Sequence, residues 1–521
     1  MKKFQYMIIL VLFSTPAWSQ GLTDALRLSD YKLNGTARAT AMGNAFGSLG
    51  GDFTSASVNP AGIGLYRSNE FVLSTRFGEN QVDAVYLNKT TNESNFHLSV
   101  PNIGYVATFS PEVKNGSSLV SVNLGIGYNR VNDFNIKKLV SGDNATSSML
   151  DLFVRNANGL APNNAPSNLD AFYEQLAGYY ETDDGYVGTD LIYNNAEGAP
   201  QGVYGHDMQR FPYGGDYENY AHGQRMSFSE KGCVDEYILS VAANFNHRVY
   251  VGATLGIQDV YFRERTSLFE YDANSTIPLL KDYTFDTYLR TTGTGYNAKF
   301  GVIVKPVDPL RLGVALHTPT FYDLHDSYYN DMYSSFDDGV RLEAFSPYGD
   351  YDYKLQTPLK AVFSAAYVIG KAGLLSVDYD WVNYSNMKLR DGGNGYDFYD
   401  ENSEMDEVLK SVGNLHVGGE YRVSEYFSLR GGFEYFPSPY KKTADGIMQS
   451  NGDAKTLTYS GGVGWKAGNF FVDMAYKHIR NENYLNLYDV PETANPQNYT
   501  SPTAKFKNYS DFLTFTIGYR F

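Results

Sequence analysis

The sequence ends in Phe512-Leu513-Thr514-Phe515-Thr516-Ile517-Gly518-Tyr519-Arg520-Phe521. Every second residue from Leu513 to Phe521 is large and apolar, whereas the residues between them are mostly small or polar. Successive side chains of a β-strand point to opposite faces. A wall strand of a membrane barrel has lipid on one face and a polar lumen on the other. We therefore predict an all-β fold, a transmembrane antiparallel β-barrel.

The same alternation recurs upstream, at residues 375–382, 415–422, 457–466 and 470–477. A soluble β-sandwich also alternates, but it rarely places Asp, Glu, Lys and Arg on one face and Trp, Tyr and Phe on the other through so many strands. The aromatic residue Phe521, closing the final strand, resembles the sorting signal of bacterial outer-membrane barrels. The pattern thus predicts a bacterial outer-membrane location.

About fourteen strands can be placed between residue 69 and Phe521, and an even number is typical of bacterial barrels. Short and long connections alternate along the chain, as expected for periplasmic turns and extracellular loops. The predicted long connections are 79–101, 132–235, 266–283, 328–349, 391–411, 441–455 and 481–509. The loop at about 132–235 is expected to be partly helical, because Leu169 to Tyr180 has apolar residues at helical spacing.

Composition agrees with a barrel and excludes other classes. The chain has 45 Tyr, 32 Phe and 50 Gly, and aromatic residues are enriched in strands and barrel girdles. No stretch offers 18 consecutive apolar residues, so a helical membrane protein is not expected. The net charge of -16 argues against a nucleic-acid partner. The single cysteine, Cys233, cannot form an intramolecular disulfide.

The N-terminal region divides into two parts. Residues 1–19 have the features of a secretory signal peptide: Lys2 and Lys3, a short apolar core, and Ala17-Trp18-Ser19 before the expected cleavage at Gln20. Residues 20–68 are rich in small residues and have too few large apolar ones for a core of their own. They form either a disordered tail or a plug in the lumen of the barrel, which itself spans residues 69–521.

Several motifs resemble one known family. Residues 35–46 lead into Ser57-Val58-Asn59-Pro60-Ala61-Gly62, which resembles the N-terminal hatch of FadL-type outer-membrane transporters of long-chain fatty acids and hydrocarbons. Residues 310–319, 356–358, 377–384 and 430–439 are similar to strands and Ser/Thr-Pro steps of that family. The predicted long loop shows no such similarity.

The resemblance implies a fourteen-stranded barrel with the hatch (20–68) in its lumen, and passive diffusion of hydrophobic molecules without energy input. It also implies that ligand lands on apolar loop patches and can leave sideways through the wall. We expect a monomer surrounded by outer-membrane lipid, with no cofactor. Asn59, Pro60, Ala61 and Gly62 are either gating residues or a fixed turn that seats the hatch, since Asn before Pro favours turns.

Charged residues on predicted lumen faces are candidates for ligand binding: Arg311, Arg422, Arg430 and Glu434, with Glu420 beside them. One of them could hold a fatty-acid carboxylate; alternatively they form ion-pair ladders that fill the barrel. In the long loop, aromatic residues either form a landing patch for ligand or pack the loop onto the barrel mouth. They are Phe172, Tyr173, Tyr179, Tyr180 and Phe211.

Three functions remain open from the sequence. The first is a passive transporter of hydrophobic small molecules such as long-chain fatty acids. The second is a haem-binding surface receptor, a label given to some relatives, for which His317 and His325, near Asp323 and Asp326, are the metal-ligating candidates. The third is a structural or adhesive barrel with a blocked lumen. No catalytic constellation is apparent, so an enzyme is not expected.

Overall fold

The computed structural model describes residues 21–110, 118–145, 148–149, 180–182, 185–187, 192–194, 204–206, 222–274, 280–337, 339, 341–346, 348–443, 450–488 and 502–521. The predicted signal peptide lies outside these residues, as do most of the predicted helix at 169–180 and much of the long loop. Among the described residues, no helix is long and apolar enough to cross a membrane.

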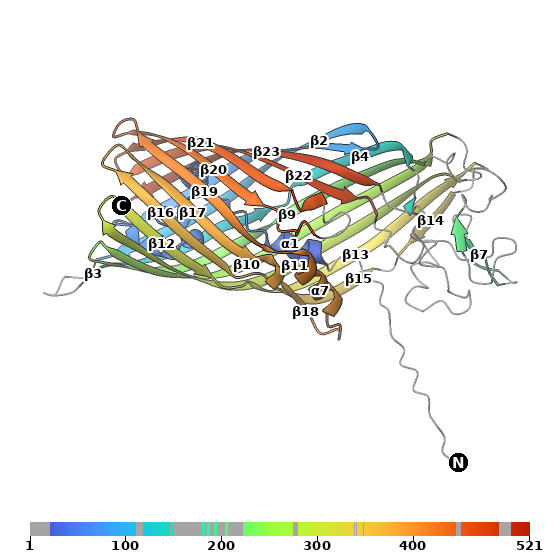
Figure 1. The fold of residues 1–521 in the computed structure, drawn as a ribbon, viewed down its shortest axis with the longest axis horizontal. Coiled ribbons are helices and arrows are strands. Elements are labelled where there is room, and N and C mark those ends of the chain that lie inside the picture. The colour runs from blue at the N-terminus through green and yellow to red at the C-terminus, as the bar shows by residue number, and fades with distance from the viewer. Residues whose placement is uncertain are drawn as a thin grey trace, which may run out of the picture.

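The chain forms a closed, antiparallel barrel of fourteen wall strands, as predicted (Figure 1). Ten wall strands are single elements: β1 (Glu70–Tyr86), β2 (Lys89–Phe109), β9 (His222–Phe245), β10 (Val249–Asp272), β11 (Leu280–Val307), β19 (Ser411–Arg422), β20 (Phe427–Pro437), β21 (Lys455–Ala467), β22 (Phe470–Asn486) and β23 (Thr503–Arg520). The last wall strand pairs with the first, from Glu70↔Arg520 to Val85↔Lys505, and this pairing closes the barrel.

The other four wall strands are interrupted. They are β3 (Leu119–Asp133) followed by β4 (Ile136–Ala145), β12 (Leu310–His317) by β13 (Phe321–Phe336), β15 (Gly349–Gln356) by β16 (Lys360–Ile369), and β17 (Gly373–Asn383) by η3 (Tyr384–Asn386) and β18 (Lys388–Asp391). Two of the interruptions are the Thr318-Pro319 and Thr357-Pro358 steps, where proline cannot donate to the ladder. The short elements β5 (Tyr180–Thr182), β6 (Gly185–Val187), β7 (Ile192–Asn194), β8 (Tyr204–His206), β14 (Arg341–Phe345) and α7 (Tyr399–Val408) belong to the connections.

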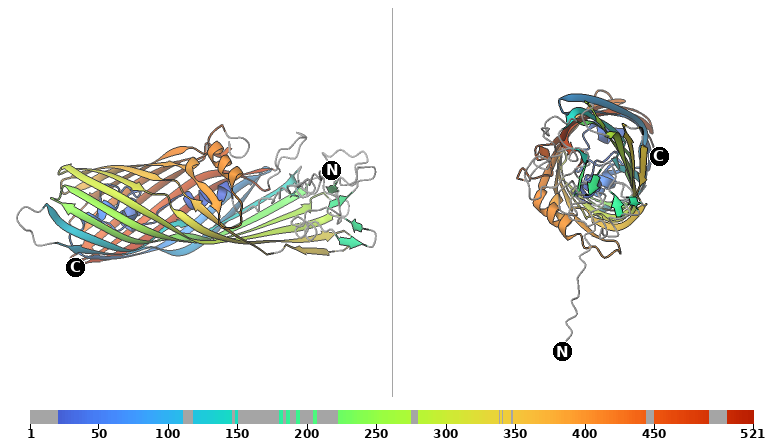
Figure 2. Two further views of the ribbon diagram at one scale, coloured as in Figure 1. Left: turned by 90° about the horizontal axis from the view of Figure 1, so that it is seen from below. Right: turned by 90° about the vertical axis from the view of Figure 1, so that its right-hand side faces the viewer.

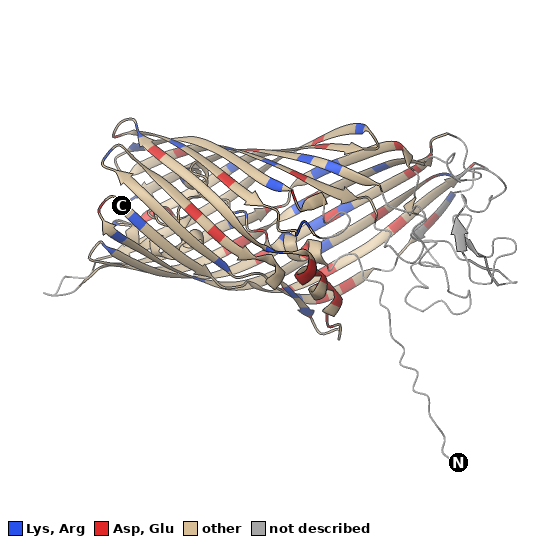
Figure 3. Cartoon of the chain, viewed as in Figure 1, with Lys and Arg blue, Asp and Glu red and all other residues tan. Residues whose placement is uncertain are grey.

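The predicted faces are confirmed in β23. Ile517 and Tyr519 are about half exposed on the outside, whereas Thr514 and Thr516 are buried. The same outward band of apolar side chains continues around the wall, for example Leu255 on β10 and Phe300 on β11. Charged residues are scattered along the strands among longer stretches of other residues, and α7 is a strongly acidic helix at the outer edge (Figure 3). The wall therefore has the apolar outer surface that a lipid bilayer requires.

The predicted connection at 79–101 is wrong. There β1 and β2 continue as a hairpin with a two-residue turn at Leu87 and Asn88, both with positive φ. Above the lipid, outward positions need not be apolar, so the hydropathy signal ends while the backbone ladder continues. The predicted connections at 266–283 and 481–509 are shortened for the same reason, because β10, β11, β22 and β23 extend into them.

The segment of residues 21–69, hereafter the inner segment, lies inside the barrel (Figure 2). It contains α1 (Leu22–Ser29), α2 (Ala37–Ala41), α3 (Ser55–Val58) and η1 (Pro60–Leu65). The helix α2 contacts β20 to β23, and η1 contacts β3, β9, β10 and β11. Wall glycines make room for this contact: a Cβ atom at Gly252 would collide with the backbone of Pro60 and Ala61.

Candidate functional site in the lumen

The inner segment begins with an amphipathic helix. Leu22, Ala25 and Leu28 recur every third residue along α1 and are buried. Arg27 in the last turn pairs with Asp24 of the first turn and, at 3.3 Å, with Glu264 of β10. The apolar face of α1 joins a buried cluster with Met405 of α7. This cluster holds the start of the inner segment against the end of the wall where α7 lies.

The Asn59-Pro60-Ala61-Gly62 tetrapeptide forms a tight, fully buried turn. The Asn59 side chain donates to the carbonyl of Gly47 (2.6 Å) and accepts from the N–H of Ala61 (3.1 Å). Pro60 occupies the first position of η1, where its missing N–H costs nothing. Asn59 is also within 3.4 Å of the carbonyl oxygens of Val302 and Val314. The geometry is that of a seated turn against β11 and β12, and a gating role for it stays a prediction.

Polar contacts join the inner segment to wall strands all around the barrel. The N–H of Gly47 donates to the Asp378 carboxylate (2.7 Å), and the N–H of Ala37 donates to the Thr516 hydroxyl (2.7 Å). Asn44 donates to Glu434 (2.8 Å). Further contacts are Arg38 to Glu420 (3.0 Å), Ser57 to Glu236 (2.9 Å), His317 to the Val58 carbonyl (2.9 Å) and His416 to the Gly43 carbonyl (3.0 Å). These buried polar groups are satisfied by the segment rather than by water.

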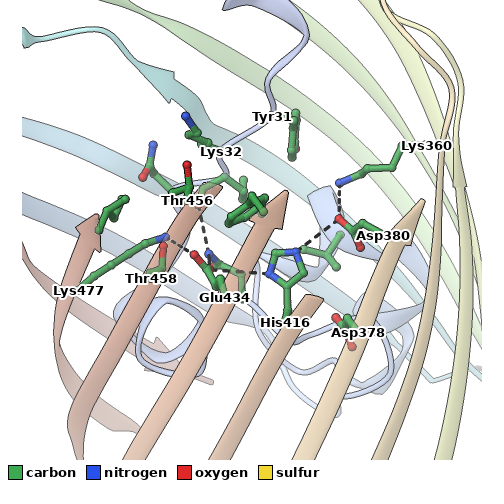
Figure 4. Close-up of a pocket in the computed structure, with 16 residues that line it drawn as sticks. Tyr31, Lys32, Lys360, Asp378, Asp380, His416, Glu434, Thr456, Thr458 and Lys477 are labelled. Carbon is green, nitrogen blue, oxygen red and sulfur yellow. Dashed lines mark hydrogen bonds and ion pairs between the residues drawn. The ribbon is translucent and has the colours of Figure 1, made fainter. Parts of the chain in front are cut away.

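A cavity of about 50 Å³ lies between the inner segment and the wall (Figure 4). We call it the lumen cavity. Its residues come from the inner segment and from β16, β17 and β19 to β22: Tyr31, Lys32, Leu33, Asn34, Asn44, Val58, Lys360, Asp378, Asp380, His416, Glu434, Phe436, Thr456, Thr458, Lys477 and Ile479. Removal from bulk water and the charge of Glu236 raise the pKa of Tyr31 well above its usual value, so its hydroxyl stays protonated.

A row of charged groups crosses the wall side of the lumen cavity. Lys360 pairs with Asp380 (3.1 Å), and Lys477 pairs with Glu434 (2.9 Å). His416 lies between the two carboxylates, 3.6 Å from Asp380 and 3.8 Å from Glu434 (Figure 4). The ammonium group of Lys360 also lies 4.6 Å from the ring centroid of Tyr31. The cavity thus combines the buried Lys477 and the partly buried Lys360 with apolar surface.

The backbone ladder between β2 and β3 covers only part of their length. It runs from Phe109↔Val122 to Asn102↔Asn129 and ends there. Beyond it β3 pairs with the inner segment instead: Lys32 N–H donates to the Val131 carbonyl (3.1 Å), and Asn34 N–H donates to the Arg130 carbonyl (3.0 Å). This stretch without β2–β3 pairing is called the wall gap.

Side chains of β1 and β2 also occupy the wall gap. Arg76 of β1 pairs with Asp133 (2.9 Å), and His97 of β2 approaches the same carboxylate at 3.4 Å. The family resemblance implied a sideways exit, but the sequence did not place it between β2 and β3 or identify the residues that occupy it. A signal was present, because Asn129-Arg130-Val131-Asn132-Asp133 interrupts the apolar alternation of the strand.

The predicted lumen residues occupy different environments. Arg430 pairs with Glu420 (2.8 Å) and Asp473 (2.5 Å), and Glu434 belongs to the lumen cavity. Arg311 donates to the Leu49 carbonyl (2.6 Å). Arg422 is the last residue of β19 and is exposed, so it does not line the part of the lumen that the inner segment fills. Arg430, Glu420 and Glu434 thus form ion pairs with other residues of the wall.

The two candidate metal-ligating histidines lie on opposite faces of the wall. His317 is buried against Val58 of the inner segment, whereas His325 is on the outer face beside Asp350 and Asp352. In the part of the chain that the structure describes, no three His, Cys, Asp or Glu residues are grouped to hold a metal ion. The predicted landing-patch side chains of Phe172, Tyr173, Tyr179, Tyr180 and Phe211 lie outside the described residues.

Comparison with known proteins gives matches in sequence and fold. The family model described as outer membrane protein transport protein (OMPP1/FadL/TodX) matches residues 240–521. A FadL homologue from Pseudomonas aeruginosa has a TM-score of 0.50 at 13% identity, over 94% of this chain and 99% of that chain. The P. putida toluene transporter TodX has a TM-score of 0.49 at 11% identity, over 93% and 98%. At these identities the likeness concerns the fold.

A relative from Neisseria meningitidis serogroup B, named as an outer membrane protein, is 30% identical over 105 residues. These residues are 20% of this chain and 22% of the relative, so the match spans less than a quarter of either protein.

Proposed function

Because this chain belongs to the outer membrane protein transport protein family (OMPP1/FadL/TodX), we propose that it is a passive channel for amphipathic hydrophobic molecules, long-chain fatty acids above all. Membership of the family places it in the outer membrane and makes transport of hydrophobic substrates its general function. The substrate class, the route and a monomeric state are our proposals.

The lumen cavity is the observation that carries the choice of a fatty acid. A carboxylate entering it can replace Asp380 as the partner of Lys360, or Glu434 as the partner of Lys477. The part of its chain next to the carboxylate would then lie against the apolar side chains of Leu33, Val58 and Phe436. An aromatic hydrocarbon offers no charge in exchange for a displaced carboxylate, and breaking a buried ion pair without a substitute costs about 3–5 kcal/mol.

The proposed route leads from the extracellular end to the lumen cavity and then sideways through the wall gap. A hydrophobic chain gains by avoiding water, so exit into lipid is favoured over exit through an aqueous pore. The gap suits such an exit because no β2–β3 backbone ladder closes it: two backbone hydrogen bonds of the inner segment, from Lys32 and Asn34, and side chains occupy it. Movement of the inner segment at Lys32 and Asn34 would open it.

The test compares uptake of radiolabelled oleate by cells with and without the protein, with radiolabelled toluene as the second substrate. We expect the protein to accelerate oleate uptake and to have little effect on toluene. Equal oleate uptake with and without the protein contradicts the proposal. A stimulation confined to toluene would leave a transporter but refute the fatty-acid assignment.

A further inference from the structure

The outer face of the barrel carries a row of cations that the transport route does not use. On three neighbouring strands, the ladder places Lys231 of β9 opposite Arg263 of β10, and Arg263 opposite Arg290 of β11. Two residues further along β10 is Arg265, whose guanidinium carbon lies 5.3 Å from the ring centroid of Tyr288 on β11. These four residues are called the basic belt.

The alternation of each strand shows that the basic belt faces outward. Val234 on β9 and Phe262 on β10 point inward and are buried. Glu264, between the two arginines of β10, points inward as well, because it pairs with Arg27 of the inner segment. Lys231 and Arg265 are exposed, and Arg263 and Arg290 are partly exposed.

The basic belt has no acidic partner among the described residues. Arg290 donates to the Ser327 hydroxyl (3.4 Å), and no ion pair within the described ranges includes any of the four cations. The nearest outward acidic residue along β10 is Asp259, four positions from Arg263, which is about 13 Å along a strand. The basic belt is therefore a local concentration of positive charge in a chain with a net charge of -16.

The opposite side of the barrel provides the contrast. On β22 and β23, the outward cations Arg480 and Lys505 both pair with Glu482, at 3.2 and 3.0 Å. Lys507 lies opposite Glu482 in the same ladder. Each cation of this side therefore has a carboxylate of the wall beside it, whereas no ion pair within the described ranges includes a cation of the basic belt.

The position of the basic belt along the barrel axis indicates which layer of the membrane it contacts. Below it on the same strands is an outward apolar band that includes Tyr237, Ile257 and Tyr296, each about half exposed. Lys231 is six residues above Tyr237, about 20 Å along the strand, or about 15 Å along the barrel axis at a typical tilt. This places the cations just outside the hydrocarbon layer, at the level of outer-leaflet headgroups.

We propose that the basic belt is a binding site for the phosphate groups of the anionic glycolipid of the outer leaflet. Guanidinium groups bind phosphate oxygens through paired, charge-assisted hydrogen bonds, and the partial desolvation of Arg263 and Arg290 reduces screening by salt. The inference uses the chain's location in the outer membrane and is independent of the transported substrate.

The test measures binding of radiolabelled phosphorylated lipid A to the detergent-purified full-length protein, to the Lys231→Gln/Arg263→Gln/Arg265→Gln variant, and to a matched control. The control, Arg480→Gln/Lys505→Gln/Lys507→Gln, removes the same charge from the opposite side, where the cations lie beside Glu482. A basic side chain at an anionic lipid surface contributes about fivefold in affinity, so the belt variant should bind about a hundredfold more weakly. The control should bind like the unmodified protein.

Further measurements in the same experiment identify the ligand and check that the variants are folded. Dephosphorylated lipid A should bind weakly to all three proteins, and millimolar inorganic phosphate should not displace labelled lipid A. Equal loss in both variants, equal binding of the two lipid forms, or displacement by inorganic phosphate would each overturn the proposal. Heat-modifiable migration on gels checks that the variants are folded. Oleate uptake reports separately on the proposed transport and should be the same in the belt variant.

Discussion

Replacement of Asn59 by alanine removes a side chain that bridges two backbone groups of the inner segment. The amide donates to the Gly47 carbonyl at 2.6 Å and accepts from the Ala61 N–H at 3.1 Å, and Asn59 is fully buried. Since the wall strands bury this turn, we expect that water does not replace either bond. The variant therefore leaves one donor and one acceptor unsatisfied inside the barrel.

The expected cost follows from these two groups. A buried polar group left without a partner costs about 1–3 kcal/mol, so with two such groups Asn59→Ala should destabilise the seated inner segment by about 2–6 kcal/mol. The wall ladders are untouched, and barrel stability should change little. A change of about 3 kcal/mol raises the open population of the segment by about a hundredfold.

Hydrogen exchange of the purified protein in detergent measures this population. The amides of Ala61 and Gly62 should lose about a hundredfold in protection, while the amides of β10 and β23 keep theirs. Asn394→Ala, which alters an exposed asparagine of an outer connection, serves as the control. Unchanged protection at residues 59–62 in the Asn59→Ala variant would refute the view that this side chain seats the turn.

Three further predictions test the wall and the lumen cavity. Lys360→Gln should lower oleate uptake at least tenfold, because an ion pair to the carboxylate is lost, and toluene uptake measured in parallel should not change. Gly252→Val should displace the turn at Pro60, since its Cβ would collide with that backbone; trypsin should then cut within residues 21–69 in the folded barrel, whereas resistance would contradict this packing. Asn402→Ala should destabilise the contact between α7 and β18 by about 1–3 kcal/mol, because Asn402 bonds both the N–H and the carbonyl of Leu389, each at 2.9 Å; faster exchange at Leu389 is the expected readout.

Much of the wall could be predicted from the sequence because lipid imposes a strict rule on every second residue. Residues such as Leu513 and Ile517 follow this rule, and the fourteen strands could be placed by it. The rule ends where lipid ends, which is why the hairpin around Leu87 was missed. There, cross-strand hydrogen bonds alone maintain the strands, and they leave little trace in composition.

The candidate site was predicted less completely. Arg430 and Glu434 could be placed on the inner face by parity, but their partners Asp473 and Lys477 lie on β22, which is not a sequence neighbour of β20. Nothing in the spacing of His416 indicates that it lies between Asp380 and Glu434. Such groupings depend on the stagger of neighbouring strands, which is fixed only when the whole barrel closes.

The dependence of the inner wall on its contents has a consequence for the cell. Asp378, Glu420 and Glu434 of the wall bond to the inner segment rather than to water. If residues 21–69 were deleted, these carboxylates would line a wide hydrated tube through a membrane whose purpose is to exclude solutes. Bacteria making such a truncated protein should become sensitive to large hydrophilic antibiotics that the intact outer membrane keeps out.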